Sequence, residues 1–172
     1  MPDLLAQRRD LLLAPLLAAL PLALSEEARA TPLDPQQTMV TLPDQIAWKA
    51  RPNWPKNSAA TATLFGSLNQ PGLYYMLMKW YPGYMSAPHT YVTDRLCVVV
   101  SGTWWVNSGA DFDPAHCIPA PAGTFVRRVA HTPHYDGVVA NGTEPAVIAI
   151  CGVGPVERQY LDPGKPGWRV VS

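Results

Sequence analysis

Four histidines are the residues of this chain best suited to chemistry, and three of them fall in two short segments. His89 lies in the first segment, five residues before Asp94, whereas His131 and His134 lie in the second. Imidazole nitrogens and carboxylate oxygens are ligands that iron, zinc and manganese accept in proteins. If the fold brings them together, His89, His131, His134 and Asp94 would suit a divalent metal. The alternative for His131 is that it is a surface residue of a turn.

Tyr91 and Arg95 are the candidate catalytic residues beside His89. Residues two apart on a strand share a face, so the Tyr91 phenol lies on the same side as the His89 imidazole. There it can serve as an acid or base, contact a substrate, or ligate a metal as a phenolate. The Arg95 guanidinium is always charged and is repelled by a bound cation. It is therefore expected either to pair with Asp94 or to hold a carboxylate of a substrate.

Short strands separated by turns must position these residues. The chain contains 19 prolines and 12 glycines, which disfavour a helical bundle and favour strands joined by turns. The pair Asn141-Gly142 between two apolar runs predicts a hairpin turn, because both residues tolerate positive φ. The pattern predicts an all-β sandwich or barrel, with strands at residues 61–64, 73–80, 96–106, 124–129, 137–140 and 146–153 and an edge strand at 46–49.

Alternation along these strands separates neighbouring side chains to opposite faces. Of Trp104 and Trp105, one is expected to face the interior and the other the outside. Arg127 and Arg128 divide in the same way, so that one of them can reach a pocket as a partner for an anion.

Three cysteines, Cys97, Cys117 and Cys151, leave at least one without a partner in the chain. Cys97 and Cys151 lie in apolar runs that are typical of strands, where cysteine behaves as a small buried hydrophobe. A disulfide between these two is the alternative if their strands are neighbours and the compartment is oxidising.

The first thirty residues predict an export signal, with Arg8 and Arg9 before an apolar stretch at residues 11–24 and a small-x-small site ending at Ala30. The arginine pair also resembles the twin-arginine motif of bacterial export. We therefore expect a signal peptide at 1–30, a proline-rich arm at 31–58 and a barrel at 59–172, in the periplasm and free of the membrane after cleavage. An uncleaved anchor or a retained helix is the alternative.

Charge and hydropathy exclude several other classes of protein. Thirteen basic residues balance thirteen acidic ones, and no basic cluster is present that would predict binding to nucleic acid. Hydrophobic residues make up 48% and charged residues 15%, which is enough apolar material for a core. No apolar run reaches the roughly 18 to 20 residues of a membrane-spanning helix.

The segment around His89 resembles the first motif of the cupin family, Gly-x5-His-x-His-x3/4-Glu-x6-Gly. Gly83, His89 and Gly102 match this motif at the right intervals. The second histidine of the motif falls on Tyr91 and the glutamate falls on Arg95. By this resemblance, His89 is the one usual metal ligand that this motif keeps, and Tyr91 and Arg95 replace the other two.

The second cupin motif is matched in part. His134 takes its histidine position, whereas Val138 stands where the closing asparagine is expected. The segments 121–125 and 152–155 also resemble those of one group of small cupins, and the resemblance covers roughly residues 44–164.

This resemblance implies an antiparallel jelly-roll β-barrel that binds a divalent metal (iron, manganese, zinc or nickel) at its mouth. His89 and His134 would be the retained ligands, with Asp94, Tyr91 or His131 completing the site. The expected function is oxygenation, isomerisation or elimination on a small oxygenated or carboxylated molecule. The alternative is a metal-free cupin that serves as a small-molecule-binding or structural module. The resemblance also implies a homodimer.

Overall fold

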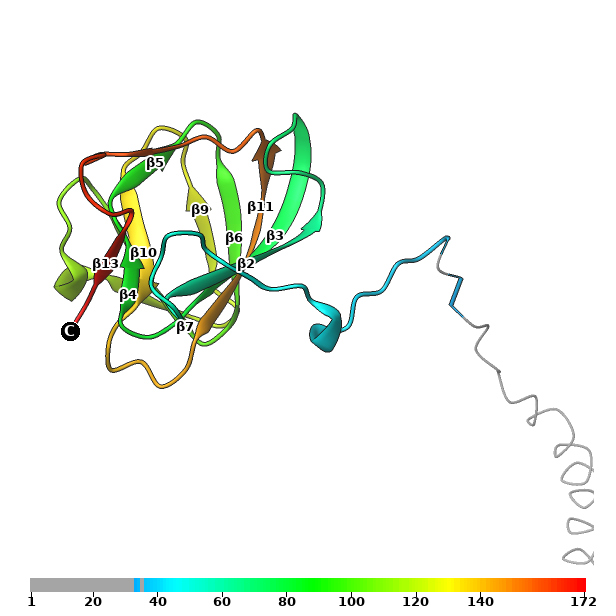
Figure 1. Cartoon of the computed structure of the whole chain (residues 1–172), viewed down its shortest axis with the longest axis horizontal. Coiled ribbons are helices and arrows are strands. Elements are labelled where there is room, and N and C mark those ends of the chain that lie inside the picture. The colour runs from blue at the N-terminus through cyan, green and yellow to red at the C-terminus, as the bar shows by residue number, and fades with distance from the viewer. Residues whose placement is uncertain (1–32, 35) are drawn as a thin grey trace, which may run out of the picture. The chain divides into compact units, whose positions relative to one another are not determined.

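The computed structural model describes residues 33–34 and 36–172, and the chain divides into two units, Met1–Thr41 and Leu42–Ser172 (Figure 1). The predicted export signal at residues 1–30 lies outside the described residues. Within the described part there is no helical segment with the length and apolar character that crossing a bilayer requires.

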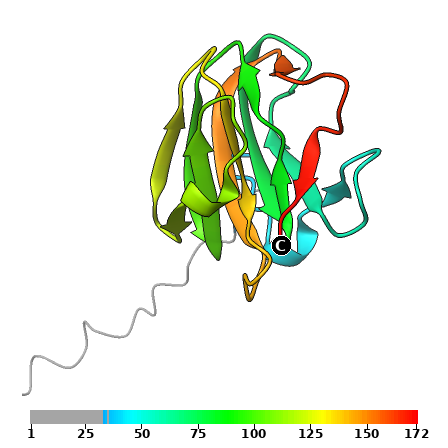
Figure 2. The same cartoon turned by 90° about the vertical axis from the view of Figure 1, so that its left-hand side faces the viewer.

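The second unit consists of antiparallel strands in two sheets that face each other, as Figures 1 and 2 show. The six-stranded sheet has the order β1-β2-β3-β11-β6-β9. Its strands are β1 (Lys49–Ala50), β2 (Ala59–Phe65), β3 (Gly72–Trp80), β11 (Ala146–Gly154), β6 (Arg95–Ser101) and β9 (Phe125–Arg128).

The seven-stranded sheet has the order β12-β5-β10-β4-β13, and β7 joins it by pairing with both β10 and β8. Its strands are β12 (Arg158–Tyr160), β5 (His89–Tyr91), β10 (His134–Val138), β4 (Tyr84–Ser86), β13 (Trp168–Val170), β7 (Thr103–Ser108) and β8 (Ile118–Pro121). Two short 3-10 helices, η1 (Pro43–Gln45) and η2 (Pro114–His116), are the helical elements among the described residues. The predicted all-β class is confirmed.

The main core fills the space between the sheets because alternate residues of each strand point inward. It includes Tyr74, Met76, Met78 and Trp80 of β3, together with Val99, Trp104, Ile148 and Ile150. A second, smaller cluster covers the other face of the seven-stranded sheet around Tyr135, and Trp105 packs against it. Trp104 and Trp105 therefore face opposite sides, as their positions in the sequence predicted.

Several predicted elements differ from the structure. The edge strand predicted at 46–49 is the two-residue β1 (Lys49–Ala50), and the strand predicted at 137–140 is β10 (His134–Val138). The run 96–106 is two strands, β6 and β7, which belong to different sheets and are separated by Gly102. Gly102 has φ of 70°, and a Cβ there would lie 2.5 Å from the Pro145 carbonyl oxygen. The turn between β6 and β7 therefore requires glycine at this position. The predicted Asn141-Gly142 hairpin is wrong, because this turn joins β10 to β11, which pair with other strands in opposite sheets.

The alternative disulfide between Cys97 and Cys151 is also wrong. Their strands β6 and β11 are neighbours, but Cys97 lies opposite Ile150 and Cys151 lies opposite Leu96. Adjacent positions point to opposite faces of a sheet, so Cys97 enters the core while Cys151 faces outward. All three cysteines are free.

Candidate functional site

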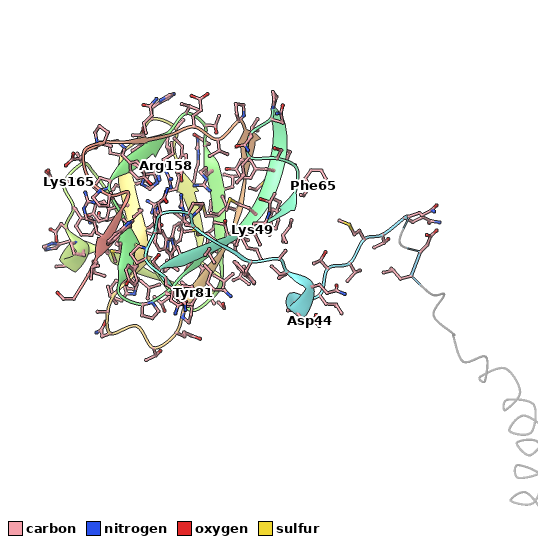
Figure 3. All side chains as sticks on the ribbon, in the orientation of Figure 1. Asp44, Lys49, Phe65, Tyr81, Arg158 and Lys165 are labelled. Carbon is pink, nitrogen blue, oxygen red and sulfur yellow. The ribbon has the colours of Figure 1, made fainter. Side chains whose placement is uncertain are left out.

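A cavity of about 320 Å³ lies within the barrel between the two sheets. Four of the predicted metal-binding and catalytic residues line it: His89, Tyr91, Arg95 and His134. Arg158, which follows on β12 beside β5, also lines it and is labelled in the upper part of the barrel in Figure 3.

His89 and His134 lie directly opposite each other on the paired strands β5 and β10, with ring centroids 4.5 Å apart. The Nδ1 atom of His89 lies 2.8 Å from the Ala87 carbonyl oxygen, and that of His134 lies 2.9 Å from the Thr132 carbonyl oxygen. A carbonyl only accepts hydrogen bonds, so each Nδ1 carries the proton and donates it. Both Nε2 atoms therefore keep a lone pair that can accept a hydrogen bond or a proton.

Both imidazoles are uncharged at neutral pH. Burial, with a smaller contribution from the neighbouring His134, lowers the pKa of His89 to about 3. Burial also lowers the pKa of His134, and the Arg128 guanidinium adds to this effect. The cavity thus contains two neutral acceptors rather than two cations.

The predicted catalytic residues Tyr91 and Arg95 meet beside these histidines. The Tyr91 ring centroid lies 5.0 Å from that of His89, and the Arg95 guanidinium carbon lies 4.2 Å above the Tyr91 ring. Arg95 also donates a hydrogen bond from Nε to the hydroxyl of Tyr74 at 3.1 Å. These contacts hold the guanidinium in place. Among the described residues, the hydrogen-bond partner of its terminal nitrogens is the Met76 sulfur, 3.7 Å from Nη2.

Asp136 is a cavity residue that the sequence analysis did not find. Its carboxylate accepts a hydrogen bond from Trp104 Nε1 at 3.1 Å and forms an ion pair with Arg128 at 3.3 Å. Burial alone would raise the pKa of Asp136, but Arg128 and, to a smaller extent, the histidines and Trp104 together hold it below its usual value. Asp136 is the single carboxylate among the described residues that line the cavity, and Arg128 already neutralises it.

Three further arginines line the cavity, Arg51, Arg95 and Arg158. None of them forms an ion pair with a carboxylate in the part of the chain that the structure describes. Burial lowers the pKa of Arg51, and the Arg158 guanidinium is the next cause. In addition, the register of β6 and β9 places Arg95 directly opposite Arg128. The cavity therefore has an excess of positive charge.

Asp94 and His131 do not line the cavity. Asp94 precedes inward-facing Arg95 and so turns outward, where it accepts hydrogen bonds from Arg127 Nε at 2.7 Å and from the Ala130 amide at 2.8 Å. The Ala130 amide and then Arg127 lower the pKa of Asp94. His131 is exposed with φ of 58°, and its amide donates to the Tyr91 carbonyl at 2.7 Å.

The predicted ligand set of His89, His131, His134 and Asp94 is therefore not assembled. Among residues 33–34 and 36–172, no group of three or more histidine, cysteine or acidic side chains is placed to bind a metal ion. Two imidazoles beside three unpaired guanidiniums do not fit the four-ligand site that the resemblance implied, because guanidiniums repel a cation and supply no lone pair.

The cavity residues that were missed differ in whether the sequence signals them. Asp136 lies two positions after His134 on one strand, so alternation alone would have placed it on the same face. Arg128 was not missed: the sequence predicted that one of Arg127 and Arg128 faces inward, and Arg128 is that residue. Nothing local in the sequence indicates that Arg51 and Arg158 meet Arg95.

No family model matches the chain, and no curated protein matches it either. Solved structures do match. An RmlC-like cupin from Ralstonia eutropha has 17% identity and a TM-score of 0.57, covering 78% of this chain and 77% of that chain. The polyketide cyclase RemF from Streptomyces resistomycificus has 10% identity and a TM-score of 0.55, covering 70% and 84%. A cupin-superfamily sugar phosphate isomerase from Silicibacter pomeroyi has 15% identity and a TM-score of 0.53, covering 69% and 79%. These likenesses show the fold, a cupin jelly roll, as the sequence resemblance implied.

Proposed function

We propose that this cupin barrel binds a small organic anion in its cavity, held by Arg51, Arg95 and Arg158. The observation that carries the proposal is that these three arginines line one cavity, and that none of them forms an ion pair with a carboxylate among the described residues. These arginines are partly buried, and charges withdrawn from water are costly unless they are paired, so an anionic ligand would stabilise the site. Guanidinium matches carboxylate and phosphate through paired hydrogen bonds, so either group fits as the anionic part.

The remaining walls of the cavity suit the organic part of such a ligand. They are apolar on the side of β3 and β11, where Met76, Met78, Trp80, Ile148 and Ile150 line the cavity. A volume of about 320 Å³ lies at the lower end of the range for small-molecule sites. We therefore infer a compact ligand with one anionic end and a short carbon skeleton.

The neutral imidazoles provide for acid–base chemistry on the bound anion. The Nε2 lone pair of His89 or His134 can take a proton from the ligand, and the Tyr91 phenol beside them can donate one. An anion bound near His89 would raise the pKa of its imidazole, which burial and its cationic surroundings hold low in the free protein. Isomerisation removes a proton from the substrate and returns it at another position, whereas elimination removes a proton from carbon and delivers one to the leaving group. Both need a base and an acid, so these two of the predicted reaction classes suit the site.

Calorimetric titration of the full chain with butyrate, inorganic phosphate and butyramide tests the anion site. Butyramide has the size of butyrate without its charge, so we expect at least one of the anions to bind and butyramide to bind much more weakly. Arg95→Gln should weaken anion binding by roughly 10-fold to 100-fold, the value of a hydrogen bond between charged groups. Arg127→Gln is the matched control, because Arg127 is exposed on the outer face of the same sheet.

Two outcomes would overturn the anion site. One is that neither anion binds, and the other is that Arg127→Gln weakens binding as much as Arg95→Gln does. The second outcome would mean that the general charge of the protein, rather than the cavity, attracts the anion.

A second candidate function is metal-dependent chemistry at His89 and His134, which the tautomers of these residues favour. In known sites a metal-ligating histidine donates its other ring proton to a carbonyl or carboxylate, as both Nδ1 atoms do here. His89 and His134 are the two residues that would hold a divalent metal, and the metal would supply Lewis acidity. Elemental analysis of the full chain, beside His89→Ala and His134→Ala, tests this: stoichiometric metal that both variants lose would establish it.

A further inference from the structure

The Nε atom of Arg128 is the one buried side-chain nitrogen or oxygen in the described residues that has no hydrogen-bond partner. Arg128 is more than nine-tenths buried and borders the cavity. A buried N–H group without an acceptor costs roughly 1–3 kcal/mol, so such groups in folded proteins usually have a partner. The open space of the cavity is where a partner for this N–H group can enter.

The other contacts of Arg128 hold the guanidinium in this position. Nη1 donates to the Asn107 carbonyl at 3.0 Å, and Nη2 donates to the Asp136 carboxylate at 3.3 Å. The guanidinium carbon also lies 5.1 Å from the centre of the Trp104 ring. A rotation that gave Nε a protein acceptor would break these contacts, so the Nε–H group stays available to a ligand.

Charge distinguishes Arg128 from the other arginines of the cavity. Its positive charge is neutralised by Asp136, whereas Arg95 directly opposite it has no carboxylate partner in the described chain. An uncharged oxygen therefore suits Arg128 Nε, and the anionic group suits Arg95. Arg95 and Arg128 are cross-strand neighbours and both line the cavity, so one small ligand can present its anionic group to Arg95 and an uncharged oxygen to Arg128 Nε.

We propose that the ligand of the anion site is a carboxylate that also carries an uncharged oxygen close to it, as a 2-hydroxy or 2-oxo acid does. This inference rests on the proposed anion site. Arg95 binds the carboxylate, and Arg128 Nε donates a hydrogen bond to the oxygen at carbon 2. In a 2-hydroxy acid the same hydroxyl also donates its proton to a neutral imidazole, since the Nε2 atoms of His89 and His134 are free to accept.

Titration of the full chain with butyrate, 2-hydroxybutyrate and 2-oxobutyrate tests the inference, because these probes differ only at carbon 2. We expect at least one of the two oxygenated acids to bind about 10-fold or more tightly than butyrate. In Arg128→Lys the charge that faces Asp136 is kept while the Nε–H group is lost, so this ratio should fall to about 1. Arg127→Lys, the adjacent change on the outer face, should keep the ratio of the unchanged protein.

The outcomes separate this inference from the anion site on which it rests. Equal binding of all three acids by the unchanged protein would overturn the 2-oxygenated ligand, as would a ratio that persists in Arg128→Lys, while leaving the anion site in place. Failure of all three acids and of phosphate to bind would overturn both. The comparison of the three acids needs no variant, so it holds even if Arg128→Lys does not fold.

Discussion

Asp136 and Arg128 show how a single buried pair supports the cavity. Each is almost fully enclosed, and each depends on the other for its counter-charge. Removing one member of such a pair leaves an uncompensated charge in a medium that solvates it poorly. The stability of the barrel and the position of the Arg128 Nε–H group are therefore linked through one carboxylate.

We predict that Asp136→Asn destabilises the protein by about 3 kcal/mol, because the Arg128 charge is left unpaired. Urea unfolding at pH 7 measures the change in the free energy of unfolding. Asp162→Asn is the matched control: Asp162 also pairs with a cation, Lys165, but both are exposed, so a far smaller loss is expected. Equal losses in the two variants would contradict the prediction.

His89 should make stability depend on pH. Its pKa is about 3 in the folded protein and about 6.5 in an unfolded chain, so between these values the unfolded state binds a proton that the folded state does not. The free energy of unfolding is therefore complete above pH 6.5 and falls as the pH is lowered, by up to about 1.4 kcal/mol per pH unit for this residue. Unfolding curves between pH 4 and pH 7 should show a shallower slope for His89→Gln than for the unchanged protein. A slope for His89→Gln that equals that of the unchanged protein would contradict the prediction.

At the scale of elements, the turn between β6 and β7 carries the chain from one sheet to the other. β6 brings Arg95 to the cavity and β7 brings Trp104, so the turn at Gly102 positions residues on both walls. This turn combines positive φ with a close approach to the Pro145 carbonyl.

Gly102→Ala should accordingly destabilise the barrel more than a change at a glycine that has positive φ alone. Gly123 provides that comparison, since its φ is 89° and a Cβ there would meet nothing within 4 Å. We expect Gly123→Ala to cost roughly 1–2 kcal/mol from the left-handed backbone and Gly102→Ala to cost more, because its Cβ would overlap an oxygen. Thermal or urea unfolding of the two variants measures the difference, and a larger loss at Gly123 would refute this account.

At the scale of the whole molecule, the outer face of the six-stranded sheet is rich in exposed apolar side chains. They lie on neighbouring strands, and they are Phe65, Leu73, Tyr75, Leu96, Val98, Val100, Phe125 and Val153. Phe65 is labelled in Figure 3, where it projects away from the barrel. Apolar patches that extend over several strands commonly mark an interaction surface.

The homodimer that the sequence resemblance implied stays a prediction, and this face favours it. Sedimentation of the full chain at micromolar concentration should show a dimer. Val98→Lys, in the middle of the patch, should shift the protein toward the monomer, whereas Ile118→Lys should not, because Ile118 is exposed on β8 in the other sheet. A monomer for the unchanged protein would contradict the prediction. Export to the periplasm likewise stays a prediction, since residues 1–30 lie outside the described part.

The sequence by itself determined the features that depend on neighbours along the chain. Alternation along a strand correctly separated Trp104 from Trp105 and Arg127 from Arg128, and the cupin resemblance placed His89 and His134 in one barrel. Tertiary structure decided what alternation cannot reach. Asp94 and Arg95 are adjacent, so they face opposite sides, and the register of β6 in the sheet decided that Arg95 is the one that faces the cavity. Arg51, Arg95 and Arg158 come from strands and loops far apart in the chain, and only closure of the two sheets brings their charges together, because that packing depends on the whole barrel rather than on any local pattern.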